Sequence, residues 1–84
     1  MVAMTMKATQ AERLQALREL TTSGKAREIR EAARLTESEI ARSVGAHYSS
    51  VSRWESGERM PRGQVAFRYA ALLERLAKAK AEAS

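Results

Sequence analysis

The stretch from Thr36 to Gly57 reads TESEIARSVGAHYSSVSRWESG. It contains two short helical patterns separated by a glycine. Thr36 followed three residues later by Glu39 is the capping box that opens a helix, and Gly45 stands where a residue of positive φ would end it. The second pattern, over residues 48–55, also ends before a glycine. Two short helices joined by a tight glycine turn predict a helix-turn-helix.

Small and apolar residues lie where the two helices would face each other. They are Ile40, Ala41, Gly45, Val51 and Trp54. Ala41 is small because bulk there would push the helices apart, and Gly45 turns the chain without steric cost. Val51 and Trp54 are three apart, on one face of the second helix, so we assign Trp54 to the core.

The opposite side of the second helix carries a polar arc. At about 100° per residue, four of its side chains share an arc of roughly 140°: Tyr48, Ser49, Ser52 and Arg53. An aromatic hydroxyl, two short hydroxyls and a guanidinium suit base edges in a DNA major groove. Arg53 is the strongest single candidate, because its planar fork can donate two hydrogen bonds to guanine.

The rest of the chain extends this to an all-α domain of five helices. Ala, Leu, Glu, Arg, Lys and Met dominate the composition, and these residues have the highest helix propensities. Besides the two central helices, apolar spacing predicts helices at about 8–20, 25–34 and 64–78. We divide the chain into an N-terminal tail and added amphipathic helix (1–24), a helix-turn-helix domain (25–79) and a C-terminal tail (80–84).

Composition excludes several classes of function. The 84 residues include no cysteine and one histidine, His47, so a disulfide framework, a metal site or a Cys/His catalytic pair is not expected. No acid–base pair or phosphate loop can be assembled, and we therefore expect neither an enzyme nor a cofactor. No run suits a membrane span or signal peptide, which predicts a cytoplasmic protein. The net charge of +5 favours an acidic partner such as nucleic acid.

From Leu35 to Pro61 the chain resembles the phage-repressor and Cro type of helix-turn-helix regulators, often called XRE-like; the resemblance extends over about residues 25–76. It implies a lambda-repressor-like bundle that binds a double-stranded operator as a homodimer, in a prokaryotic or phage-encoded, nucleoid-associated protein. It also implies a buried ion pair between Arg30 and Glu55. Glu37 departs from the family, which often has a phosphate-contacting glutamine there.

The resemblance and the positive charge together suggest contacts to DNA phosphates. Five arginines between positions 42 and 68 oppose only two glutamates, and the family commonly touches the backbone in the loop after the recognition helix. The candidate phosphate contacts are Thr36, Arg42, His47, Arg59 and Arg62. Tyr69 is expected to pack in the core, whereas Phe67 lies off the main apolar stripe and is open to either packing or a dimer contact.

The function expected from these observations is a sequence-specific transcriptional regulator, a repressor of a phage or other mobile element. An alternative is an antitoxin-type regulator, whose added helix would bind a protein partner through Leu14, Leu17 and Leu20. A third reading is a module whose helix-turn-helix packs only against protein. Failure to bind any duplex at low salt would favour the third reading, and co-purification with a partner the second.

Overall fold

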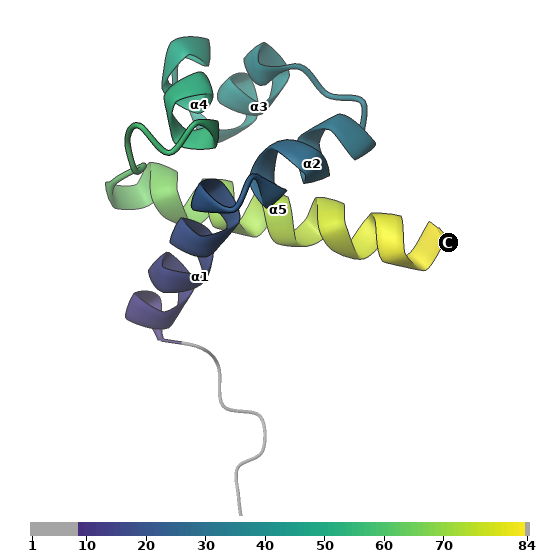
Figure 1. The fold of residues 1–84 in the computed structure, drawn as a ribbon, viewed down its shortest axis with the longest axis horizontal. Coiled ribbons are helices and arrows are strands. Elements are labelled where there is room, and N and C mark those ends of the chain that lie inside the picture. Colours follow the sequence, from purple (N-terminus) through teal and green to yellow (C-terminus); the bar gives the residue numbers. More distant parts are fainter. Residues whose placement is uncertain (1–8, 84) are drawn as a thin grey trace, which may run out of the picture.

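The computed structural model describes residues 9–83, and within them all regular structure is helical. The helices are α1 (Gln10–Thr22), α2 (Lys25–Ala32), α3 (Glu37–Val44), α4 (Tyr48–Glu55) and α5 (Gly63–Ala83). α5 is the longest and packs against α1, α2 and α3, while α3 and α4 pack against each other (Figure 1). The five predicted helices are therefore confirmed, with α4 at its predicted bounds.

The ends of α1 are shifted from the prediction of 8–20. Thr9 caps the helix, since its hydroxyl accepts from the Glu12 N–H at 3.1 Å and its own N–H donates to the Glu12 carboxylate at 2.8 Å. The predicted start, Ala8, lies outside the described residues. At the other end the helix continues through Thr21 and Thr22, beyond the predicted end at Leu20, and both hydroxyls donate to the Arg18 carbonyl, at 3.0 and 2.9 Å.

α2 ends at Ala32 rather than at Arg34. Arg34 has a positive φ of 61°, and the N–H groups of Arg34 and Leu35 return to the carbonyls of Glu31 and Arg30 at 3.0 and 3.2 Å. This is a Schellman ending, in which glycine usually takes the left-handed position. An arginine there gave no sequence signal for a helix end.

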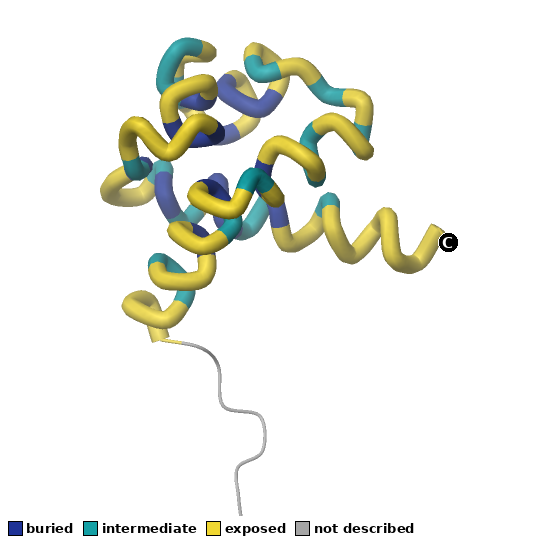
Figure 2. Tube along the Cα trace, viewed as in Figure 1, coloured by how far each residue is buried: buried dark blue, intermediate teal, exposed yellow. Residues whose placement is uncertain are grey.

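α5 continues to Ala83, beyond the predicted end at Lys78 and through most of the predicted tail. The last residues alternate Ala with Lys and Glu, which favour a helix even without a core to pack on. Figure 2 shows these last turns exposed and projecting from the bundle. The predicted end at Lys78 was wrong because the absence of large apolar residues after Leu76 does not end this helix.

The core lies where α5 meets the other helices. Tyr69 is buried in it as expected, and Phe67 is half-buried beneath the Arg13 guanidinium, 5.8 Å from its ring centroid. Four alanines allow close approach of the helix backbones. The buried apolar residues are Leu17, Ala26, Ile40, Ala41, Val44, Val51, Trp54, Ala66, Tyr69, Ala70 and Leu73.

α1 belongs to this core. Leu17 is 1% exposed, and Leu14 and Leu20 pack against the buried cluster. Thr21 is 2% exposed, and its hydroxyl lies 3.6 Å from the sulfur of Met60, a residue of the loop between α4 and α5. Of the leucine face that the antitoxin hypothesis assigned to a partner protein, Leu17 is thus buried in the core, whereas Leu14 and Leu20 are partly buried beside it.

No helix among the described residues is long and apolar enough to cross a bilayer.

Candidate nucleic-acid interface

Helix α3, which leads into the turn before α4, is capped at both of its ends. At the start of α3 the Thr36 hydroxyl accepts from the Glu39 N–H at 3.0 Å, and the Thr36 N–H donates to the Glu39 carboxylate at 2.8 Å. At the end Gly45, with a φ of 82°, donates its N–H to the Ala41 carbonyl at 2.9 Å. A side chain at this φ would be strained. These are the cap and the stop that the sequence predicts.

His47 caps the recognition helix α4. Its Nδ1 accepts a hydrogen bond from the Ser49 N–H at 3.2 Å and lies 2.8 Å from the Ser49 hydroxyl. An Nδ1 that accepts from a backbone N–H leaves the proton of the neutral ring on Nε2. The imidazole therefore accepts the backbone hydrogen bond that a Ser or Thr side chain usually accepts at an N-cap. Its ring also lies against Tyr48, with centroids 4.7 Å apart.

An ion pair holds the inner side of α4 against α2. The Arg30 Nε and Nη2 donate to both oxygens of Glu55, the second at 3.0 Å, and the Arg30 Nη1 donates to the Leu35 carbonyl at 3.0 Å. The hydrogen bond to Glu55 raises the pKa of Arg30, so the guanidinium stays charged. This is the pair that the family resemblance implies, and it fixes the rotation of α4 about its axis.

The polar arc of α4 faces outward. Val51 and Trp54 are 0% and 6% exposed, whereas Ser52 and Arg53 are exposed and Tyr48 retains 55% of its surface. Ser49 differs from the other three residues of the arc because it is half-buried and its hydroxyl is at hydrogen-bond distance from the His47 Nδ1. The arc is thus presented as predicted, with Ser49 turned toward the cap rather than straight outward.

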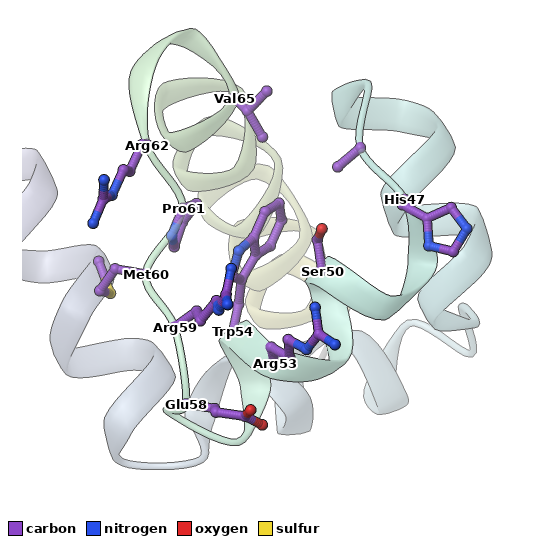
Figure 3. A pocket seen from close by; sticks show the side chains of 11 residues that line it. His47, Ser50, Arg53, Trp54, Glu58, Arg59, Met60, Pro61, Arg62 and Val65 are labelled. Atoms are coloured by element: carbon purple, nitrogen blue, oxygen red, sulfur yellow. The ribbon is translucent and has the colours of Figure 1, made fainter.

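The candidate phosphate contacts divide into two groups. His47, Arg59 and Arg62 line one groove together with Arg53, between α4 and the loop that joins it to α5 (Figure 3). We call this the α4–α5 groove; its volume is about 790 Å³. Thr36 and Arg42 do not line the groove; both are exposed, Thr36 as the N-cap of α3 and Arg42 in its last turn.

Three more residues of the groove were not predicted to contact DNA, and one of them, Trp54, was assigned to the core. Ser50, Trp54 and Glu58 also line the α4–α5 groove. Ser50 and Trp54 are four residues apart and therefore share one side of α4, a spacing that could have suggested Ser50. Glu58 lies in the loop after α4, and its N–H donates to the Arg53 carbonyl at 2.9 Å. No sequence pattern predicts this loop conformation.

The comparison with protein families agrees with this geometry. A family model described as helix-turn-helix matches residues 27–77, which include α3, α4 and most of α2 and α5. The chain belongs to this family, in agreement with the XRE, or Cro/C1-type, resemblance. No curated protein and no solved structure matches the chain.

The family is one of DNA-binding transcription regulators, and the exposed arc of α4 is the surface that such a domain presents. α1 and the last residues of α5 lie outside the matched region.

Proposed function

We propose that this protein is a sequence-specific regulator that occupies a double-stranded operator as a two-fold dimer and represses transcription, in a phage or other mobile element. α4 would lie in the major groove. The observation that carries this proposal is the exposure of Tyr48, Ser52 and Arg53 on a helix whose other side is held by a buried ion pair. Such a helix presents its polar arc in one orientation.

Each residue of the arc has a role that follows from its position. Arg53 is in the last turn of α4 and would donate two hydrogen bonds to guanine O6 and N7. Tyr48 and Ser49 begin the helix, where side chains of a recognition helix reach base edges. Ser52 lies between them on the same arc. Arg42, Arg59 and Arg62, with Thr36 and His47, would contact phosphates and set the register on the duplex.

Selection of bound duplexes from a random-sequence DNA pool tests the proposal. We expect an enriched palindrome whose half-sites are separated by about one helical turn. Arg53→Ala should relax the preference at one base position, because one good bidentate contact provides about 1–3 kcal/mol of discrimination. Arg75→Ala, an exposed arginine in the second half of α5, is the matched control and should leave the selected sequence unchanged.

Enrichment of no sequence by the wild-type protein would contradict the proposal. An unchanged preference in Arg53→Ala would refute the role of Arg53 alone. Arg59→Ala should instead weaken binding to all sequences about equally, as a phosphate contact does.

A further inference from the structure

Trp54 combines a core ring with an indole N–H that has no acceptor among residues 9–83. The residue is 6% exposed, and its ring lies on Tyr69 with centroids 4.9 Å apart. Among the described residues only the Tyr69 hydroxyl is both fully enclosed and unpaired, and the Trp54 indole N–H donates no hydrogen bond to any of these residues. The indole nitrogen therefore has access to the space that Trp54 lines, which is the α4–α5 groove.

The groove around this N–H is positively charged. Arg53, Arg59 and Arg62 line it against one carboxylate, Glu58. Figure 3 shows the Trp54 ring between the loop and the turn of α4 that carries Ser50, with the arginines around it. An anion seated there would be attracted by the guanidinium groups and would meet a neutral donor at the wall of the groove.

The wall of the groove is fixed. The N–H groups of Glu58 and Arg59 both donate to the Arg53 carbonyl, at 2.9 and 3.3 Å, which folds the loop back onto the end of α4. Pro61 is buried, and the indole packs against the Tyr69 ring. Unlike a surface arginine, the indole N–H needs little side-chain ordering on binding, since its ring is already immobile in the core.

We propose that the Trp54 indole N–H donates a hydrogen bond to a backbone phosphate of bound DNA, seated in the α4–α5 groove between Arg59 and Arg62. This inference rests on the proposed function and adds to it a neutral donor that belongs to the core. The contact carries no base information. It fixes how deeply α4 enters the major groove, because the indole cannot move without disturbing the packing on Tyr69.

The test replaces the N–H while keeping the shape of the ring. Trp54→3-benzothienylalanine puts sulfur in place of the indole nitrogen, and Trp54→Phe is a second variant. We expect affinity for a mixed-sequence duplex of about 20 base pairs to fall about tenfold for each bound subunit in the first variant, the size of one hydrogen bond to a charged group. Tyr69→Phe is the matched control, since it removes a hydroxyl that does not reach the groove, and it should keep wild-type affinity.

Salt dependence separates a direct contact from a distorted groove. A neutral donor releases no counterion, so the slope of log K against log salt should be unchanged in the Trp54 variants. A slope that falls toward zero would mean that Arg59 and Arg62 had moved, and would contradict a direct role. Helical circular dichroism of each variant verifies that it is folded.

The chain has one tryptophan, so its indole N–H gives a single, unambiguous proton resonance. We expect this resonance to move downfield when the mixed-sequence duplex is added at low salt. If the wild-type protein binds DNA but neither the resonance nor the affinity of the Trp54 variants changes, this inference fails and the proposed function stands. If the wild-type protein binds no duplex, both fail.

Discussion

The Arg30–Glu55 pair places two charges where little solvent reaches them, with side chains 12% and 4% exposed. Removing such groups from water costs several kcal/mol for each ion, which the pairing offsets only while both partners are present. The pair also spans α2 and α4, so it joins the first helix of the matched region to the helix that carries the polar arc.

Replacing either partner alone should therefore be severe. We expect Arg30→Met or Glu55→Met to lower the free energy of unfolding by about 3–5 kcal/mol, because each leaves a buried charge without its partner. The double variant should lose less free energy of unfolding than the sum of the losses in the two single variants. Urea denaturation in a double-mutant cycle measures this coupling. Additive losses would show that the pair is not coupled.

Arg34 gives the opposite prediction. Its φ of 61° is costly for a residue with a Cβ, so Arg34→Gly should raise the free energy of unfolding by up to about 1 kcal/mol, after the greater freedom of glycine in the unfolded chain is subtracted. Arg27→Gly, at an exposed arginine inside the preceding helix α2, should lower the free energy of unfolding by about 1 kcal/mol. Thermal melts of the two variants distinguish them, and a destabilised Arg34→Gly would contradict the assignment.

At the scale of elements, α1 lies outside the matched family region yet packs as part of the core. Leu17→Ala should lower the free energy of unfolding by about 2–5 kcal/mol, as expected for a buried leucine. Gln15→Ala, exposed on the same helix, should change it little. Urea titration followed by circular dichroism measures both. Near-wild-type stability of Leu17→Ala would mean that α1 is not needed by the fold.

The capping boxes of α1 and α3 make stability depend on pH. The backbone hydrogen bond from Thr36, and then its side-chain hydrogen bond, lower the pKa of Glu39 from 4.5, and Thr9 acts in the same way on Glu12. A carboxyl whose folded pKa is lowered stabilises the protein above its unfolded value, and this contribution is lost as pH falls through the folded value. Stability should therefore decrease below pH 4.5.

Glu39→Gln tests this dependence without removing the cap, because glutamine can also accept the Thr36 N–H. The variant should lose less stability than the wild type as the pH is lowered below 4.5. Thermal melts across that range give the comparison. Identical pH profiles of the two proteins would exclude Glu39 as a source of the acid sensitivity.

Elements also show which parts of the structure the sequence could predict. The bounds of α4 and the stop at Gly45 follow from local signals, a cap and a glycine, and are confirmed. The predicted end of α2 was wrong because Arg34 adopts a left-handed conformation that glycine usually takes. The position of α1 was beyond prediction, since an amphipathic stripe indicates burial but not the helix that buries it.

The candidate site divides in the same way. Helical periodicity alone places Tyr48, Ser52 and Arg53 on the exposed arc, and the structure agrees. The α4–α5 groove depends on a loop whose N–H groups fold back onto the Arg53 carbonyl. That is a tertiary arrangement without a sequence signature, so the placing of Trp54 and Ser50 beside Arg59 could be learned only from the structure.

At the scale of the whole molecule, the net charge is +5, and only some of the arginines are paired with carboxylates. Arg30 is consumed by Glu55, Arg27 pairs with Glu31 at 3.1 Å, and Arg13 lies 3.7 Å from Glu74. No such ion pair within the described residues involves Arg53, Arg59 or Arg62. Arg59 and Arg62 are therefore available to neutralise phosphates, next to the arc on which Arg53 would read a base.

The number of phosphates neutralised sets the salt dependence of binding. About three contacts per subunit give about six in a two-fold dimer, so the slope of log K against log salt should be about −5, whereas a single subunit should give about −3. Fluorescence anisotropy of the selected operator between about 50 and 200 mM salt measures the slope. Arg59→Ala should reduce its magnitude by about one for each bound subunit. A slope near zero in the wild-type protein would mean that the guanidinium groups of the groove do not meet the DNA backbone, and would contradict the proposed docking of α4.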